Sequence, residues 1–185
     1  MIICLTGLPG SGKTVSAKIF KINGFKVIGM SLEIKQLMKK QNIEINNKNL
    51  RNFSNELRKK YGNEIVAKLT VKRARAILKK GEKQKVKLLI EGIRSLQEIR
   101  YFKKLFKKIY VIAVISNQKI RYERISKRAR KDDTKSYKDF LWREDKELKW
   151  GVEDSIKSAD ILIFNNSTKK ELKNNIYSLI QKLED

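Results

Sequence analysis

A glycine-rich octapeptide at residues 7–14, Gly-Leu-Pro-Gly-Ser-Gly-Lys-Thr, constrains this chain more than any other segment. It satisfies the pattern G-x-x-x-x-G-K-[ST] in full, and it lies between an apolar run at residues 2–6 and a helical pattern from about Lys13 to Lys21. Glycines allow a curled backbone whose successive N–H groups point at phosphate oxygens, and the following helix adds the positive end of its dipole. The octapeptide therefore predicts a loop that binds nucleotide phosphates.

Within this loop, two residues have the most specific expected roles. Lys13 would reach the β- and γ-phosphates of ATP, and the hydroxyl of Thr14 would ligate Mg²⁺. A loop of this kind indicates the phosphoryl donor and not the reaction, because GTP switches, motor ATPases and kinases share it. The predicted ATP-binding residues of the loop are Gly7, Leu8, Pro9, Gly10, Ser11, Gly12, Lys13 and Thr14.

Apolar, β-branched runs alternate with helical patterns along the rest of the chain. The expected strands are residues 2–6, 25–29, 87–92, 109–115 and 159–164. This alternation predicts an α/β fold with a mostly parallel sheet covered on both faces. Two helical excursions, at about 31–80 and about 126–150, look like inserts on one core, so we expect a single domain over residues 1–185. The first excursion has an asparagine-rich break near 42–49, and the charged segment 129–135 is expected to be a loop.

The composition excludes several kinds of chemistry. The chain has no histidine, which rules out a Ser-His-Asp triad, a Cys-His dyad and the usual Cys/His zinc sites. Catalysis must then come from lysine, arginine, carboxylates and a metal held by oxygen. The single cysteine, Cys4, lies in an apolar run, and we expect a buried structural thiol in a cytoplasmic protein. No run approaches the roughly 18 apolar residues of a membrane span.

The chain carries 44 basic and 20 acidic residues, a formal net charge of +24. Such a field attracts polyanions, among them nucleotides, RNA, DNA and anionic membrane surfaces. A lysine-rich composition that reflects the genome or a hot habitat is the alternative explanation. The sequence leaves both open, and it gives no indication of oligomeric state.

A carboxylate at the end of the 87–92 strand favours a kinase over a GTP switch. The chain lacks the N-K-x-D and DxxG motifs of such switches, and Glu91-Gly92-Ile93-Arg94-Ser95 stands where the second would lie. Glu91 could hold Mg²⁺ through water or accept the proton of an attacking hydroxyl, and Arg94 could bind a second phosphate. An ion pair between Glu91 and a lysine is the structural alternative.

A second group of charged residues follows the 109–115 strand. On a helix, Arg121, Arg124 and Arg128 fall on one face, and Arg130 and Arg143 come after them. Arginines on a mobile flap can stabilise a transferring phosphoryl group and exclude water from it. A solvated face or an RNA-binding patch would have the same composition.

With these residues in hand, the sequence resembles the adenylate-kinase-like nucleotide kinases, most closely an archaeal family of kinase-related P-loop proteins, and it is also similar to dephospho-CoA kinases. The resemblance covers nearly the whole chain. The segments that carry it are GLPGSGKT at 7–14, LRKKYG at 57–62, EGIRS at 91–95, RARKDD at 128–133, REDKELKWG at 143–151 and ADILIFN at 159–165.

The resemblance implies a P-loop NTPase core of three layers, α/β/α, with a five-stranded parallel sheet like that of nucleoside monophosphate kinases. The 31–80 insert would close over the acceptor, and the region 126–150 would be an arginine-rich lid. Arg58 and Arg94 would hold the acceptor phosphate, and Arg124 would stack on the ATP adenine. The segment near Asn165 would face the donor base. The residues implied for the transferred phosphate are Arg128, Arg130 and Arg143, beside Lys13 and Glu91, and those implied for Mg²⁺ are Thr14 and Glu91.

One departure from the family pattern concerns the acceptor. Related kinases often carry an aspartate after the second strand and an arginine three residues later, where this chain has Leu32 and Lys35. AMP is the first expected acceptor, and dephospho-CoA, another nucleoside and an RNA end stay open. The rival hypothesis is a nucleotide-binding regulator or an RNA-associated ATPase.

Overall fold

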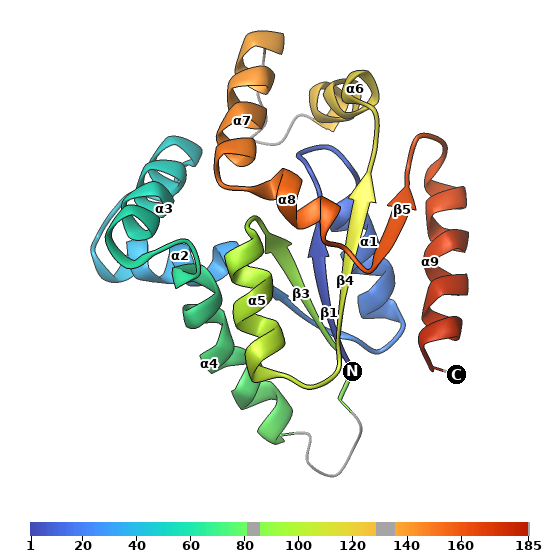
Figure 1. Ribbon diagram of the computed structural model, residues 1–185. Coiled ribbons are helices and arrows are strands. Elements are labelled where there is room, and N and C mark those ends of the chain that lie inside the picture. The colour runs from blue at the N-terminus through green and yellow to red at the C-terminus, as the bar shows by residue number, and fades with distance from the viewer. Residues whose placement is uncertain (81–85, 129–135, 185) are drawn as a thin grey trace.

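A five-stranded parallel sheet forms the centre of the molecule, in the order β2-β3-β1-β4-β5 (Figure 1). The computed structural model describes residues 1–80, 86–128 and 136–184. The strands are β1 (Ile2–Thr6), β2 (Lys26–Gly29), β3 (Leu88–Ile93), β4 (Ile109–Ile115) and β5 (Ile161–Phe164). The predicted five-stranded parallel α/β fold of the P-loop class is therefore confirmed.

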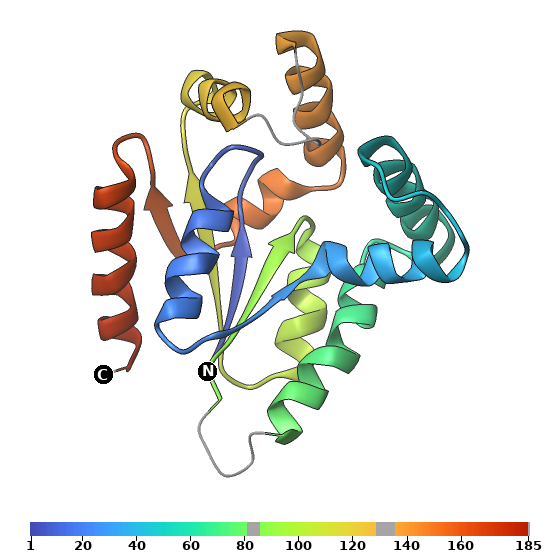
Figure 2. The same ribbon diagram turned by 180° about the vertical axis from the view of Figure 1, so that it is seen from behind.

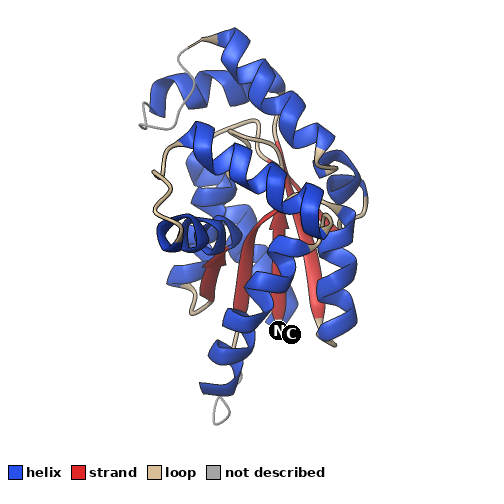
Figure 3. Cartoon of the chain, turned by 90° about the vertical axis from the view of Figure 1, so that its left-hand side faces the viewer, coloured by secondary structure: helices blue, strands red, loops and turns tan. Residues whose placement is uncertain are grey.

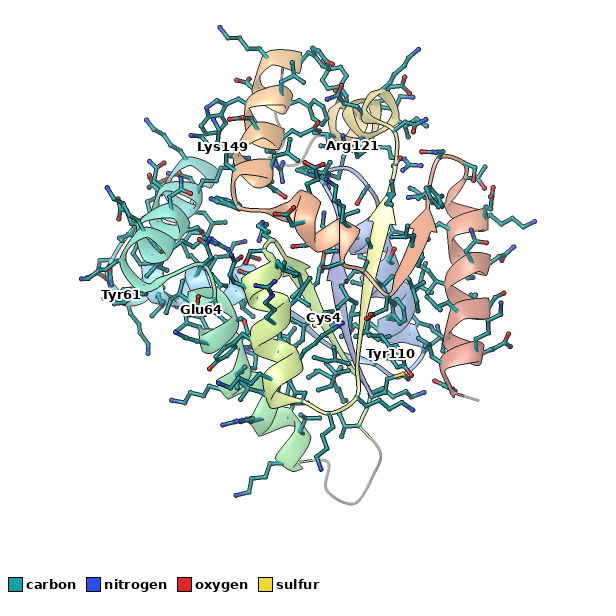
Figure 4. The ribbon with its side chains drawn as sticks, viewed as in Figure 1. Cys4, Tyr61, Glu64, Tyr110, Arg121 and Lys149 are labelled. Carbon is teal, nitrogen blue, oxygen red and sulfur yellow. The ribbon has the colours of Figure 1, made fainter. Side chains whose placement is uncertain are left out.

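The side chains of the central strands alternate between two hydrophobic cores, as the twofold period of a strand requires. In β1, Ile3 and Leu5 pack on the face that α1 (Lys13–Ile22) and α9 (Lys169–Glu184) cover. Figure 2 shows this face. Ile2 and Cys4 pack on the opposite face, so β1 is buried on both sides. The expected buried position of Cys4 is confirmed, and Figure 4 shows it in the middle of the sheet.

The opposite face is covered by α4 (Ile65–Lys80), α5 (Leu96–Leu105) and α8 (Val152–Lys157) (Figures 1 and 3). The sheet thus lies between two layers of helices. Burial of both faces explains why the strands read as continuous apolar runs in the sequence.

Three helices occupy the predicted first insert: α2 (Met30–Lys40), α3 (Asn47–Tyr61) and α4. Residues 41–46 separate α2 from α3 and overlap with the asparagine-rich segment 42–49. Asn46 caps α3, because its side-chain oxygen accepts a hydrogen bond from the backbone N–H of Asn49 at 2.9 Å. An asparagine at this position favours the start of a new helix over the continuation of α2.

Helices α6 (Gln118–Arg128) and α7 (Tyr137–Lys149) lie beyond the carboxyl ends of the strands (Figure 1). Helix α7 begins at the N-cap Ser136, which accepts from the backbone N–H of Asp139. It is separated from α8 by Gly151, whose φ of 93° is a left-handed value that favours glycine. The charged segment predicted as a loop, 129–135, lies outside the described residues.

Both chain termini lie at the end of the sheet opposite to α6 and α7 (Figures 1 and 3). The carboxyl ends of the strands, where ligands of open α/β sheets bind, therefore face α6, α7 and the first insert. Within residues 1–80, 86–128 and 136–184, none of the helices combines the length and hydropathy that a membrane crossing requires.

Candidate phosphoryl-transfer site

The glycine-rich octapeptide joins β1 to α1 and is braced by the end of β5. Asn165, which follows β5, is buried, and its Nδ2 donates a hydrogen bond to the carbonyl of Ser11 at 2.7 Å. Gly12 has a φ of 112°, and a Cβ at this position would overlap with Nδ2 of Asn165. Gly12 is therefore required both for the backbone turn and for the close approach of Asn165.

Lys13 is half-buried, and its ammonium lies against the loop. Its Nζ donates hydrogen bonds to the carbonyls of Gly7 and Leu8, the second at 2.9 Å. Burial lowers the pKa of Lys13 to about 8; the negative charges of Glu147 and Glu91 oppose this change, and the positive charge of Arg94 adds to it. The ammonium of Lys13 therefore lies near the charged side chains of Glu91, Arg94 and Glu147.

Thr14 and Glu91 meet at the carboxyl ends of β1 and β3. The Thr14 hydroxyl donates to a carboxylate oxygen of Glu91 at 3.2 Å. A hydroxyl and a carboxylate are the hard oxygen ligands that Mg²⁺ takes together with water and phosphate oxygens. Among the residues that the structure describes, no group of three or more His, Cys, Asp or Glu could hold a metal by itself. The two side chains fit a magnesium ion that shares its other ligands with a nucleotide.

Arg58 and Arg94 both contact the ring of Trp150. Their guanidinium carbons lie 4.8 and 5.5 Å from the ring centroid, and the indole N–H donates to Oδ1 of Asn55 at 2.6 Å. Asn55 and Arg58 belong to α3, Arg94 follows β3, and Trp150 ends α7. The cluster therefore joins the first insert, the core and the predicted lid.

Arg58 is held in a buried ion pair with Glu98 of α5. Its Nη2 lies 3.0 Å from Oε1 of Glu98, and the two side chains are 4% and 0% exposed. The other carboxylate oxygen of Glu98 accepts from the backbone N–H of Arg94 at 2.7 Å. Burial raises the pKa of Glu98, and the charge of Arg58 opposes that rise. In this structure Arg58 connects α3 to α5 and does not extend into open space.

Arg94 is more accessible, with 23% of its side chain exposed. Its Nε lies 3.7 Å from Oε2 of Glu147, a residue of α7 that is 7% exposed. Of the two arginines expected to hold an acceptor phosphate, Arg94 is thus the one whose side chain reaches a partly open position.

Arg121 is buried between α6 and the phosphate loop. Figure 4 labels it just below α6. It donates to the carboxylate of Glu144, to the carbonyl of Pro9 at 3.2 Å and to that of Ser116 at 2.9 Å. Glu144 also accepts from the side-chain amide of Gln118 at 2.8 Å. These bonds connect α7 to the phosphate loop through α6.

Arg124 lies on the outer side of Asn165. It donates to the carbonyl of Asn165 at 2.9 Å, to that of Ser167 at 3.1 Å and to the hydroxyl of Ser116 at 3.2 Å. Burial lowers the pKa of Arg124. The structure therefore brings together Arg124 and Asn165, the two residues expected to face the donor base. In it, the carbonyl of Asn165 accepts a hydrogen bond from Arg124.

The remaining predicted arginines belong to the lid region. Arg143 is half-buried in α7, and its positive charge lowers the pKa of Lys13. Arg128 ends α6 and is half-buried, with an interaction partner of its own. Arg130 lies outside the described residues.

Sequence reasoning missed three members of the site: Glu98, Glu147 and Trp150. The last two had a usable signal, because Glu147 follows Arg143 by one helical turn and Trp150 follows Glu147 by three residues. Arg143, Glu147 and Trp150 therefore share one face of α7. Glu98 had no such signal, since its partner Arg58 is 40 residues away.

Comparisons with known proteins show which family the chain resembles. A family model described as an AAA domain matches residues 3–149. A UPF0200 protein of Thermococcus onnurineus is 35% identical over 99% of this chain and 98% of its own length. A UPF0200 protein of Pyrococcus horikoshii is 37% identical over 99% of this chain and 97% of its own length.

Solved structures show the same fold at low sequence identity. The Thermus thermophilus protein TT1252 superposes with a TM-score of 0.68 at 17% identity and covers 99% of this chain and 97% of its own. Dephospho-CoA kinase from Campylobacter jejuni superposes at 0.58 with 16% identity, over 98% of this chain and 96% of its own. Shikimate kinase from Acinetobacter baumannii superposes at 0.55 with 18% identity, over 98% of this chain and 93% of its own. The fold is thus that of P-loop small-molecule kinases.

Proposed function

We propose that this chain, which belongs to the UPF0200 protein family, is an ATP-dependent kinase that transfers the γ-phosphoryl group of ATP to a small nucleotide. The observation that carries the proposal is the convergence of charges at the carboxyl end of the sheet. Lys13 and the Thr14–Glu91 pair lie on the donor side, and Arg94 directly follows the strand that contains Glu91. A kinase needs this arrangement, since it must bind phosphates on one side and an acceptor on the other.

The residues of the site have distinct parts in an in-line transfer. The loop N–H groups and Lys13 would bind the β- and γ-phosphates, and Arg143 would add positive charge as the transferring group separates from ADP. Thr14 and Glu91 would hold Mg²⁺, which supplies charge neutralisation at the phosphate oxygens when it is bound. No protein nucleophile is needed, which agrees with a chain that has no histidine.

Two nucleotide acceptors differ in the atom that receives the phosphoryl group. AMP would offer a phosphate oxygen, and it is suggested by the resemblance to adenylate-kinase-like proteins. Dephospho-CoA would offer a ribose hydroxyl, and the fold shared with the Campylobacter jejuni dephospho-CoA kinase supports it as the second candidate. In either case Arg94 and the first insert would face the acceptor.

The proposal is tested by incubating the protein with Mg-ATP and a panel of acceptors that includes AMP, nucleosides, dephospho-CoA and short RNA, with products identified by mass spectrometry. We expect one small nucleotide to gain a phosphoryl group, and Lys13→Ala to lower the rate by about 100-fold or more. Lys149→Ala is the matched control, because Lys149 is an exposed lysine of α7 that pairs with Asp145. If no acceptor gains phosphate while ATP and RNA both bind tightly, the chain is an RNA-associated nucleotide-binding protein and the kinase proposal is wrong.

A further inference from the structure

Glu147 is a buried carboxylate that makes few interactions with the rest of the protein. It lies in the last turn of α7, 7% exposed, and its Oε2 is 3.7 Å from Nε of Arg94. This separation is longer than a hydrogen bond. Within the part of the chain that the structure describes, Glu147 accepts no hydrogen bond, so its oxygens have unused capacity to accept one.

The other carboxylates near the site are already bound by the protein. Glu98 accepts from Arg58 and from the backbone N–H of Arg94, and Glu144 accepts from Gln118 and Arg121. Glu91 accepts from Thr14, with which it would hold Mg²⁺.

Glu33 of α2 is the carboxylate that follows β2, on the acceptor side of the sheet. It is engaged with α4, because its Oε1 lies 2.5 Å from Nε of Arg73. Leu32 beside it is 43% exposed and carries no polar group. Of the carboxylates compared above, Glu147 of α7 is the one that makes the fewest contacts with the protein.

A structural role alone gives a poor account of Glu147. Removing a carboxylate from water is costly, and one ion pair at 3.7 Å without a hydrogen bond offsets little of that cost. Carboxylates that stay buried under such conditions occur often at functional sites. The positive charges of Lys13, Arg58 and Arg94 lie close enough to Glu147 to interact with it electrostatically.

The same carboxylate discriminates between acceptor groups. Both arginines expected to hold an acceptor phosphate face a glutamate, since Arg58 pairs with Glu98 and Arg94 with Glu147. A phosphate brought to Arg94 would be repelled by Glu147 in a region of low dielectric constant. A hydroxyl group carries no charge, and it requires a hydrogen-bond acceptor beside the phosphate loop.

We propose that Glu147 is the general base of the reaction and that the acceptor group is a hydroxyl, such as a ribose hydroxyl of a nucleotide. This inference rests on the proposed kinase function and narrows its acceptor. The hydroxyl oxygen forms a bond to the γ-phosphorus as the bond to the β,γ-bridging oxygen breaks, and the electron pair of that bond goes to ADP. The hydroxyl proton passes to Oε2 of Glu147 and from there to solvent.

The decisive variant is Glu147→Gln, measured in the full chain with Mg-ATP and dephospho-CoA, nucleosides or AMP as acceptor. We expect kcat to fall by about 100-fold or more, because the proton has no acceptor, while the Kd for ATP changes less than about twofold. Glu153→Gln is the matched control: Glu153 is an exposed glutamate of α8 that pairs with Lys157, and its kcat should equal that of the unaltered protein.

The pH profile separates a base from a structural group. In the unaltered protein kcat should fall at low pH as Glu147 is protonated, and this acidic limb should disappear in Glu147→Gln. The charged groups that act on this part of the cleft are Lys13, Arg58, Glu91, Arg94 and Arg143. If Glu147→Gln does not fold, Glu147→Asp is the variant that tests the role of the carboxylate. It keeps the carboxylate, so its kcat should be lower but should still fall at acidic pH.

The outcomes distinguish this inference from the proposed function. Phosphorylation of AMP on its phosphate, or a Glu147→Gln kcat within about threefold of the unaltered protein, would overturn the role of Glu147 and leave the kinase function intact. A protein that phosphorylates none of the acceptors overturns both. Transfer to a hydroxyl that depends on Glu147 supports both.

Discussion

Lys13 illustrates how a single residue is prepared for an anionic ligand. Burial against the loop lowers its pKa to about 8, and two glutamates only partly oppose this effect. The unfolded chain would hold this proton up to a pH near 10.4. Between these two values the unfolded state binds more protons than the folded state, so Lys13 makes the folded protein more stable as the pH rises from 8 to 10. Below pH 8 Lys13 keeps its charge although burial disfavours the charged form. A bound phosphate would offset this cost of burial through its negative charge.

Binding of ATP should therefore bring a proton to Lys13. At pH 8 about half of the Lys13 side chains are neutral in the free protein, and the phosphates raise the pKa again. Isothermal titration calorimetry in two buffers of different ionisation enthalpy should show an uptake of about 0.5 proton per ATP at pH 8 and close to none at pH 6.5. The affinity for ATP should fall as the pH rises above 8.

Lys13→Arg provides the control, because arginine stays charged over this range. In this variant the difference between the two buffers should disappear. Equal proton uptake in both proteins would show that another group takes up the proton.

The sequence predicted some residue contacts and not others, for a simple reason. Thr14 begins the helix after β1, and Glu91 lies near the carboxyl end of the adjacent parallel strand β3, so their meeting could be anticipated from the motif and the strand end. The pairing of Arg58 with Glu98 depends on how α3 packs against α5, which no local pattern records. Arg58 was accordingly assigned a phosphate, whereas in the structure a buried glutamate is its partner.

Among the elements, α7 has the most connections to the site. Glu144 and Glu147 are both buried, and their spacing of three residues places them on one side of the helix. Glu144 bonds Arg121 and through it the phosphate loop. Glu147 lies beside Arg94, and Trp150, which follows the helix, contacts both Arg58 and Arg94. The helix thus connects the phosphate loop to the arginines expected at the acceptor.

Trp150 should contribute more to stability than the other tryptophan of the chain. Trp150→Phe removes the hydrogen bond to Asn55 and should lower the free energy of unfolding by about 1 kcal/mol. Trp150→Ala also removes both cation–π contacts and should lower it by about 2–3 kcal/mol. Urea unfolding followed by circular dichroism measures both values.

Trp142→Phe is the reference substitution. Trp142 also belongs to the α7 region and contacts the guanidinium of Arg51, but it is 47% exposed. We expect a change within about 0.5 kcal/mol, as for most surface positions. A larger effect at Trp142 than at Trp150 would contradict the view that the buried cluster holds α7 in place.

The elements themselves were the most predictable level. The apolar runs at 2–6 and 109–115 became β1 and β4 without a change of bounds, because a strand buried on both faces has a continuous apolar pattern. The function of α7 was less visible. Its amphipathic pattern predicts a helix, but which face meets the phosphate loop is decided by the packing of α6.

For the whole molecule, the net charge of +24 is the dominant long-range feature. Several described lysines form single exposed ion pairs, such as Lys149 with Asp145 and Lys157 with Glu153, and such pairs contribute little to stability. Repulsion among the remaining positive charges opposes the compact state.

Added salt should therefore stabilise the protein. Raising NaCl from about 0.05 to 0.5 M shortens the screening length severalfold, which weakens the repulsion. A gain of about 1–2 kcal/mol would raise the melting temperature by roughly 2–8 °C in a chain of this size. Differential scanning calorimetry measures this shift. A melting temperature that falls with salt would show that ion pairs outweigh the general repulsion.

The double connection of α7 has a thermodynamic consequence for the two substrates. If ATP at the phosphate loop alters the position of α7, it alters the affinity for the acceptor, and the acceptor must then change the affinity for ATP by the same factor. The path runs from Pro9 through Arg121 and Glu144 to Trp150. One rigid helix shared by both halves makes the two binding events a single coupled equilibrium, in which neither Kd is a constant of its own site.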